Sequence, residues 1–165
     1  MERRPQETSL ATPADAEIIL RLYELRRESV MRQARAWVIG QFWPTTVEEY
    51  FAVAMNFDDP HNAFVRQVTS YWEMAAAMVL HGAVSPELFV DCNNEGFLLL
   101  AKFAPILDDI RQRLPGFLLK TSELIKRVPS AAARYDIALK NAEGIRARRS
   151  EQSTGNPQYA FPAKS

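Results

Sequence analysis

The sequence predicts an all-α fold, a single-domain helical bundle of about six helices, and three observations support this fold class. Apolar residues recur at helical spacing through most of the chain, whereas no segment shows the alternation of a half-buried strand. Proline, glycine and capping residues divide the chain at intervals that suit helices. The 165 residues suffice for one domain with a sizeable core, and the sequence contains no internal repeat.

The composition is that of an ordinary globular protein, with 47% apolar and 24% charged residues. The formal net charge is zero, so no overall field attracts nucleic acid or a membrane surface, and we expect neither partner. The longest wholly apolar run, residues 74–80, is far shorter than the roughly 20 residues of a membrane-spanning helix. The N-terminus lacks the apolar segment of a signal peptide, and a single cysteine excludes an internal disulfide, so we expect a cytoplasmic protein.

The charges are unevenly distributed along the chain. Residues 41–110 contain two basic and ten acidic residues, whereas residues 111–149 contain ten basic and three acidic residues. We expect the two regions to attract one another, either within the fold or across a dimer. The alternative is that residues 111–149 provide a basic docking surface for a partner.

The two ends of the chain differ in composition from its middle. Residues 1–11 are polar and are predicted to be a disordered lead-in. Residues 150–165 are rich in small and polar residues and are predicted to be a disordered tail. The helical domain is therefore expected over residues 12–149.

The first helix is expected over residues 13–39. Thr12 is a suitable N-cap residue, and Pro13 suits the first helical position. No further proline or glycine occurs before Gly40, which ends the segment. A turn with two large aromatic residues follows, and Thr46 is expected to cap a short helix after it.

The centre of the predicted bundle is an antiparallel hairpin of two long helices, over about residues 60–82 and 85–113. The first of them is apolar on nearly every side in its second half, which indicates a helix in the middle of a core. Gly82 suits a left-handed C-cap and Ser85 suits an N-cap, and so short a connection favours antiparallel neighbours. The main apolar row of the first helix consists of Phe64, Val68, Tyr71, Ala75 and Met78.

The second long helix contains two residues that weaken a helix. Pro105 predicts a kink or a break. Gly96 costs about 1 kcal/mol relative to alanine in mid-helix, and we expect it to allow the close approach of another helix. Cys92 lies on the apolar row of this helix, so we expect a buried and unreactive thiol.

Two further helices are expected after a break at Pro115 and Gly116. The first extends over about residues 117–127 and is ended by Pro129, and the second begins after Ser130 as its cap and ends near residue 148. The apolar row of the last helix consists mostly of small residues, which predicts close packing or a position at the edge.

The sequence contains no motif of a catalytic or cofactor site. No pair of His, Cys or carboxylate residues has the spacing of a zinc site, no serine lies in a nucleophile elbow, and no glycine-rich loop suits a phosphate. We therefore assign no catalytic, metal or cofactor-binding residue and expect no cofactor. Whether the protein is an enzyme is left open.

Four residues of the first central helix are candidates for contact with a ligand or a partner: Arg66, Trp72, Glu73 and His81. Arg66 and Glu73 are seven residues apart and share a face with Ser70 in an otherwise apolar segment. This polar strip lines a groove or an interface, or it is simply the solvated side of the helix. Trp72 is either a core residue or part of an apolar pocket.

The packing pattern of this part of the chain resembles that of a known family. The pattern begins with an aromatic pair and a glutamate. It continues with small apolar residues and a Gly-x-Val turn, and it ends in a new helix with Glu and Leu near its start. The residues are Tyr71, Trp72, Glu73, Met74, residues 79–82, Val84, Glu87, Leu88, Phe97 and Phe103. Over residues 64–113 the chain is similar to a family of small bacterial helical domains of unknown function. The resemblance implies an all-helical fold and no catalytic residue; some members carry a membrane anchor before the domain, and we expect none here.

These observations favour a non-catalytic protein that interacts with a protein partner or with itself as a homo-oligomer. The missing catalytic motifs, the divided charge and large aromatic residues expected in loops support this hypothesis. Those aromatic residues are Phe42, Trp43, Tyr159 and Phe161. The alternative is a small-molecule binding protein, or an enzyme, with an apolar pocket between the central helices near Trp72 and His81.

Overall fold

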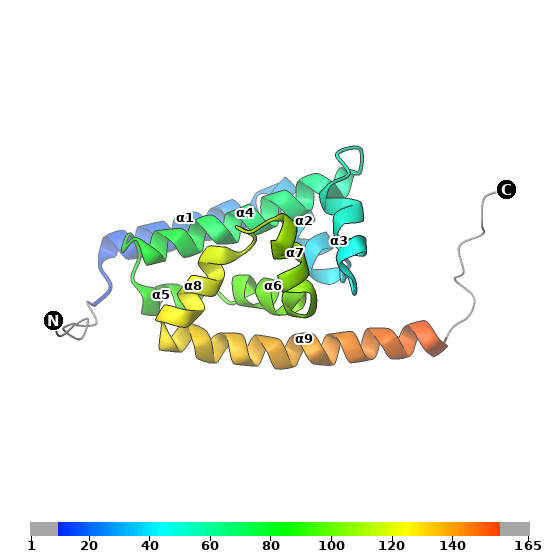
Figure 1. Ribbon diagram of the computed structural model, residues 1–165. Coiled ribbons are helices and arrows are strands. Elements are labelled where there is room, and N and C mark those ends of the chain that lie inside the picture. The colour runs from blue at the N-terminus through cyan, green and yellow to red at the C-terminus, as the bar shows by residue number, and fades with distance from the viewer. Residues whose placement is uncertain (1–9, 156–165) are drawn as a thin grey trace.

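The computed structural model describes residues 10–155, and within them it contains only helices and no strand (Figure 1). The predicted all-α fold is confirmed. The lead-in over residues 1–9 and the tail from residue 156 lie outside the described residues. The elements are α1 (Pro13–Arg27), α2 (Ser29–Gly40), α3 (Val47–Ala54), α4 (Pro60–Leu80), α5 (Pro86–Cys92), α6 (Glu95–Phe103), the 3-10 helix η1 (Ala104–Ile106), α7 (Leu107–Arg113), α8 (Leu119–Arg127) and α9 (Pro129–Gly155).

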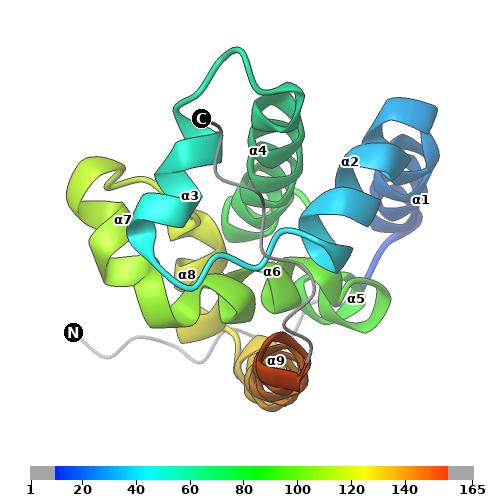
Figure 2. The same ribbon diagram turned by 90° about the vertical axis from the view of Figure 1, so that its right-hand side faces the viewer.

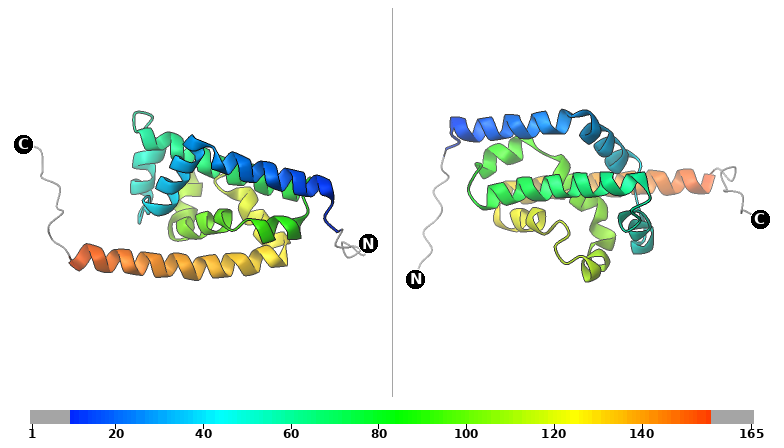
Figure 3. Two further views of the ribbon diagram at one scale, coloured as in Figure 1. Left: turned by 180° about the vertical axis from the view of Figure 1, so that it is seen from behind. Right: turned by 90° about the horizontal axis from the view of Figure 1, so that it is seen from above.

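The helices are arranged in layers (Figures 1 and 2). The long helix α4 lies with α1 and α2 along one side of the molecule, and α9 runs along the opposite side. The short helices α5, α6 and α8 lie between these two sides, and the view from behind shows the same order (Figure 3). Accordingly, α4 packs mainly against α2 and α8, and α9 packs mainly against α6 and α8.

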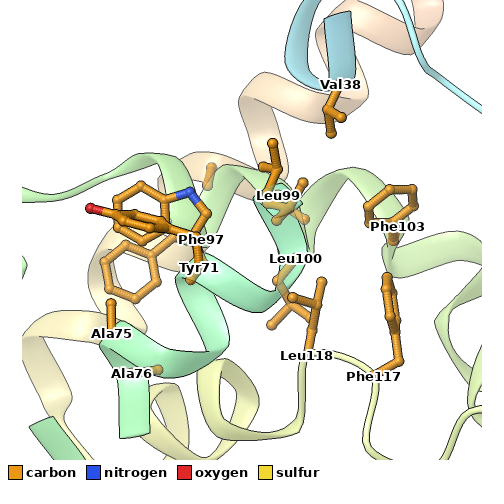
Figure 4. Close-up of a cluster of buried hydrophobic side chains, with 14 of the residues drawn as sticks. Val38, Tyr71, Ala75, Ala76, Phe97, Leu99, Leu100, Phe103, Phe117 and Leu118 are labelled. Carbon is orange, nitrogen blue, oxygen red and sulfur yellow. The ribbon is translucent and has the colours of Figure 1, made fainter. Parts of the chain in front are cut away.

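The core is centred on α6 as much as on α4. Seven of the nine residues of α6 are buried, so this helix is enclosed on nearly all sides. The apolar face of α4 meets it, and Phe117 and Leu118 from the loop before α8 complete the cluster (Figure 4). The apolar row of α4 therefore does face the core, as its spacing predicts.

The two ends of α4 form as the flanking residues predict. Asp59 accepts a hydrogen bond from the backbone N–H of His61 at 2.8 Å, and Pro60 occupies the first helical position. Gly82 follows the helix with a φ of +75°, a conformation that favours glycine. Ser85 then caps α5 with its side chain.

The single helix expected over residues 13–39 is two helices, α1 and α2, so that prediction is wrong. Glu28 leaves helical geometry between them, and its carboxylate caps α2. Two side chains from elsewhere bind carbonyl groups at the end of α1. The hydroxyl of Tyr71 donates to the carbonyl of Leu22 at 2.7 Å. The guanidinium of Arg35 donates to the carbonyl of residue 26 at 3.1 Å, and such tertiary bonds stabilise a break that no local pattern marks.

The second long helix of the expected hairpin, over residues 85–113, is also absent. Four shorter elements replace it: α5, α6, η1 and α7. The first break comes at Asn93, which is extended and buried and donates from its amide to the carbonyl of Phe89, because asparagine side chains compete with helical bonds. Pro105 lies in η1, so the interruption predicted there is confirmed.

The break after α5 also changes which residues face the core. Cys92, which we expected to be buried, is exposed, whereas the neighbouring Asn93 is buried. The expectation for Cys92 fails because α5 ends at this residue, so the apolar row does not continue through it into α6.

The aromatic residues of the turn after α2 belong to the fold and not to a free surface. Phe42 is buried, and Trp43 is partly buried and packs against the core. The indole N–H of Trp43 donates to the carbonyl of Ile39 at 2.9 Å. Tyr159 and Phe161 lie outside the described residues, so these aromatic residues no longer support an exposed interaction surface.

The last helix is longer than predicted at both ends. Pro129 occupies its first position, so Ser130 lies inside the helix and is not its cap. The preceding helix, α8, ends at Arg127 before an extended Val128, as predicted for a helix that Pro129 ends. The helix continues to Gly155, so residues 150–155 are helical although the composition predicts the start of a disordered tail. Its buried residues are small, which confirms the predicted close packing. They are Ala131, Ala138 and Ala142.

Candidate functional site

An open groove runs beside the polar strip of α4, and it is the candidate site that the predicted contact residues indicate. Its volume is about 720 Å³. Two of the four predicted contact residues, Arg66 and Glu73, line it together with Ser70. Its other lining residues are Ala63, Gln67, Thr69, Gly116, Phe117 and Leu118.

The loop between α7 and α8 forms the second wall of the groove. Leu118 has a φ of +48°, a left-handed conformation that is unfavourable for a residue with a side chain. Its side chain is buried in the core, and this burial offsets the backbone strain. Arg111 donates to the carbonyl groups of Phe117 and Leu118, at 3.0 Å each, and so fixes the loop beside α4.

Glu73 occupies one end of the groove and is fully engaged with α8. Its carboxylate accepts hydrogen bonds from the backbone N–H of Lys120 at 2.8 Å and of Thr121 at 2.9 Å. The hydroxyl of Thr121 donates to it as well, at 2.9 Å. Because the preceding residue has no capping side chain, Glu73 of α4 supplies the N-terminal cap of α8 and compensates the positive end of its dipole. This carboxylate serves the fold and is not free to act as a base.

Arg66 occupies the other end and is only partly engaged. Its Nε donates to the side-chain carbonyl of Asn62 at 2.9 Å, and buried Asn62 in turn donates to carbonyl groups at the end of α3. The guanidinium carbon lies 5.7 Å from the ring centroid of Phe57. Within the described residues the two terminal nitrogens of Arg66 have no hydrogen-bond partner. They are thus free donors in the fork geometry that binds a carboxylate through two parallel bonds.

Trp72 and His81, the other two predicted contact residues, lie away from this groove. Trp72 is 2% exposed, and the space beside its ring measures only about 10 Å³, which is too small for a ligand. His81 is exposed at the C-cap of α4. The structure therefore does not gather the four residues around one cavity. A second cavity, of about 710 Å³, lies beside His81, and it is lined by residues 79–80 and 82–87 together with Leu124 and Val128. Trp72 does not line this cavity.

Trp72 belongs to a polar network that joins three helices. The carboxylate of Glu95 accepts hydrogen bonds from Nε and Nη2 of Arg35, at 2.8 and 2.6 Å, and from the indole N–H of Trp72 at 3.2 Å. The carboxylate of Glu95 raises the pKa of Arg35, because its hydrogen bond favours the charged guanidinium. Sequence spacing gives no signal for this pair, since Arg35 and Glu95 are 60 residues apart.

Lys102 is a second charged residue whose surroundings the sequence does not reveal. It lies on the enclosed helix α6, and it is 1% exposed. Its ammonium group donates to the carbonyl of Val38 and lies 4.8 Å from the ring centroid of Trp43. Burial, together with the positive charges of Arg149 and Arg146, lowers the pKa of Lys102 to about 7.

A lysine with such a pKa is often a nucleophile, but this one is sealed from solvent and has a structural partner. With its neighbours it caps the C-terminus of α2. Arg149 donates to the carbonyl groups of residues 40 and 41, at 3.4 and 3.2 Å. Cations at the negative end of a helix dipole are favourable, so we assign Lys102 a structural role at the end of α2, although the burial of its charge opposes folding.

The unevenly charged regions of the sequence meet inside the fold. Arg134 of α9 lies 3.7 Å from the carboxylate of Asp91 on α5. Arg146 donates to the carbonyl groups of residues 101 and 102 at the end of α6, at 2.7 and 2.8 Å. Part of the basic region thus contacts the acidic region directly, as expected for attraction within the fold.

Among the described residues, no group of three or more His, Cys, Asp or Glu side chains lies close enough together to hold a metal ion. In the same part of the chain, none of the helices combines the length and the apolarity needed to cross a bilayer. A family model with the description "Domain of unknown function (DUF4760)" matches residues 11–128. No curated protein and no solved structure matches the chain.

Proposed function

The chain belongs to this family of unknown function, whose match covers the helices from α1 to α8, and from that premise we propose a non-catalytic protein-interaction module. Its groove beside α4 binds an extended, acidic segment of a partner protein. The observation that carries the proposal is the guanidinium of Arg66, which keeps two free donors at the edge of a groove of about 720 Å³. We further propose that the protein acts in the cytoplasm.

The charge of the groove supports an acidic occupant. Glu73 is the only carboxylate among its lining residues, and the backbone N–H groups at the start of α8 already compensate it. Arg66 is therefore the uncompensated charge of the groove. A carboxylate of the partner that forms two parallel hydrogen bonds with it gains charge-assisted bonds of about 1.5–3 kcal/mol.

The surface beside Arg66 also supports a protein partner. Phe57, in the turn between α3 and α4, is 76% exposed, and its ring lies beside the guanidinium. Aromatic residues and arginine are enriched where proteins meet, and a few such residues carry most of the binding energy. The apolar ring and the cation thus offer two different contacts to one segment.

Selection from a phage-displayed library of random peptides tests the proposal. We expect the wild-type protein to enrich peptides that share an Asp or Glu residue. Synthetic versions of these peptides should bind Arg66→Gln with a Kd about tenfold higher. Arg32→Gln is the matched control, because it removes one exposed arginine of α2 whose side chain makes no hydrogen bond within the described residues, and it should leave the Kd unchanged.

Peptides that bind wild type and Arg66→Gln equally well would contradict the proposal. So would a selection that enriches no acidic residue. A Kd that rises equally in Arg66→Gln and Arg32→Gln would indicate attraction to the overall charge and not binding in the groove.

A further inference from the structure

A buried amine lies where the helices α2 and α6 end. The ammonium group of Lys102, on α6, donates to the carbonyl of Val38 on α2 and is sealed from solvent. Three aromatic rings surround it, with centroids 4.8–5.7 Å from Nζ. They belong to Phe42, Trp43 and Phe103. The burial of this amine depends on the elements that cover it, and one of them is the end of α9.

The end of α9, residues 143–152, forms a strap beside the amine. Arg146 donates to the carbonyl groups of residues 101 and 102, and Arg149 donates to those of residues 40 and 41. Both arginines thus bind the helix ends next to Lys102, and the positive charge of each acts on it. Three cations from α6 and α9 therefore gather around one set of helix ends.

The strap is attached to the fold without a buried side chain. The last buried residue of α9 is Ala142, and every residue of the strap is partly or fully exposed. The hydrogen bonds of Arg149 are exposed and are 3.2 and 3.4 Å long. A segment with few buried contacts and exposed hydrogen bonds opens at a lower cost in free energy than the whole domain.

The charges of the strap are unfavourable for a protonated Lys102. The strap contains three arginines and two glutamates, which gives it a net charge of +1. Arg148 and Glu151 are exposed. Burial lowers the pKa of Arg146, and the neighbouring carboxylate of Glu143 opposes that shift. The closed strap therefore holds like charge beside a buried amine.

The other titratable groups near the amine do not offset this effect. On α2 and α6, Arg35 and Glu95 are bound to one another. Tyr50 of α3 packs against the rings of Phe42 and Phe103, and burial raises its pKa, so it stays neutral. The protonation of Lys102 is thus linked mainly to its burial and to the strap.

We propose that the strap is a pH-sensitive cover, which is closed beside Lys102 in alkaline solution and opens locally as the pH falls toward 7. When the strap leaves, water reaches the ammonium group and both arginines move away, so the pKa of Lys102 returns from about 7 toward its ordinary 10.5. Between these values the open form binds more protons than the closed form, so closure becomes more favourable as the pH rises. The ratio of closed to open forms changes by at most about tenfold per pH unit.

This opening is separate from peptide binding and from unfolding of the domain. The groove lies beside α4, whereas α9 runs along the opposite side of the molecule (Figure 1). The remaining part of α9 stays attached, because Ala131, Ala138 and Ala142 are buried. A detached end of about ten residues is too short to remain a stable helix by itself, so it becomes accessible to a protease.

Limited proteolysis of the full chain with trypsin tests the strap, because trypsin cleaves after arginine and the strap contains Arg146, Arg148 and Arg149. The cleavage rate follows the population of the open form when the strap closes faster than it is cut. Dividing this rate by that of a synthetic peptide of residues 143–152 removes the pH dependence of trypsin itself. We expect the relative rate for the wild type to fall about tenfold from pH 7 to pH 9.

Two variants and one internal reference complete the experiment. Lys102→Met should make the relative rate independent of pH, whereas Lys140→Met, at an exposed position of the same helix, should keep the fall. Circular dichroism shows that both variants are folded. Cleavage after Arg111, whose guanidinium is bound to the loop before α8, reports unfolding of the whole domain.

Three results would each overturn the proposal. The first is a relative rate for the wild type that does not change between pH 7 and pH 9. The second is an equal fall in Lys102→Met, which would show that another group is responsible. The third is cleavage of the strap that changes only together with cleavage after Arg111, which would show that the strap does not open by itself.

Discussion

Gly96 of α6 lies directly against the indole of Trp72 on α4, and a Cβ atom at residue 96 would lie 3.1 Å from two atoms of the ring. The missing side chain of the glycine thus makes room for the indole ring of Trp72 against the backbone of α6. The ring has little freedom to move away, because Trp72 is buried and its N–H is bound to Glu95. The glycine thus weakens its own helix but permits the central contact of the core.

Gly96→Ala is expected to lower the free energy of unfolding by about 1 kcal/mol. Overpacking costs about 1–3 kcal/mol, and the better helix propensity of alanine returns only about 1 kcal/mol. Gly144→Ala, in the middle of α9, is the control, because the nearest atom to its Cβ is the guanidinium of Arg148 at 4.0 Å. That substitution should raise the free energy of unfolding by about 0.5–1 kcal/mol. Urea unfolding measures both, and stabilisation by both would show that Trp72 has room to move.

Glu73→Gln is expected to lower the free energy of unfolding by about 1–3 kcal/mol, because the amide nitrogen that replaces one oxygen points a donor at a backbone N–H of α8. The substitution also removes the negative charge beside the positive end of that helix. Asp136→Asn, an equivalent change at an exposed position of α9, should have almost no effect. Thermal and urea unfolding distinguish the two; equal stabilities would remove the capping role from Glu73.

Lys102 is expected to make the stability of the protein depend on pH between about 7 and 10. Burial lowers its pKa to about 7 in the folded state, whereas its ordinary pKa is 10.5. Between these two values the unfolded chain binds one proton more than the folded chain, so the free energy of unfolding increases with pH. The largest slope that one such group can produce is about 1.4 kcal/mol per pH unit. Below pH 7 the lysine is protonated in both states and contributes no slope.

Urea unfolding at several pH values between 6 and 9.5 measures this slope, with Lys102→Met as the comparison. The variant should be more stable than the wild type at pH 6 and should lack the rise in stability above pH 7, because no charge is left to desolvate. The range ends below pH 10 because burial raises the pKa of Tyr71 to about 12, and stability then falls as the tyrosine of the unfolded chain loses its proton first. A wild type and a variant with parallel pH profiles would contradict the burial of a titrating lysine.

The parts of the fold that sequence predicts well are those determined by neighbouring residues. The ends of α4 follow from Asp59, Pro60 and Gly82, which act through their own backbone geometry and short-range hydrogen bonds. The interruption at Pro105 has the same local cause. These features depend on a few adjacent residues, so a single chain read in order reveals them.

The breaks at Glu28 and Asn93 lie at neither a proline nor a glycine, so the sequence does not mark them clearly. Glu28 is a weak capping residue by type, and the side chain that binds the freed carbonyl of residue 26 comes from Arg35 on the next helix. Asn93 is buried with its amide satisfied, and periodicity alone continues the helix through it. Once these breaks are missed, the register of the following residues is wrong, which explains the error at Cys92.

The candidate groove likewise combines features that the sequence reveals with features that it does not reveal. The spacing of Arg66, Ser70 and Glu73 places them on one face of a helix, and the structure puts all three beside the groove. The sequence does not reveal that the loop after α7 forms the opposite wall or that α8 uses the carboxylate of Glu73. A polar strip on a helix therefore marks where a contact occurs, and only the tertiary partner decides whether that contact is internal.

The helix α9 begins one residue after the stretch shared with the family, which ends at residue 128. Its alanines nevertheless pack against α6, and Arg146 and Arg149 bind the last carbonyl groups of α6 and α2. The residues that match the family model thus do not include every residue that buries α6. A recombinant fragment trimmed to residues 11–128 would expose the covered side of α6 and would aggregate.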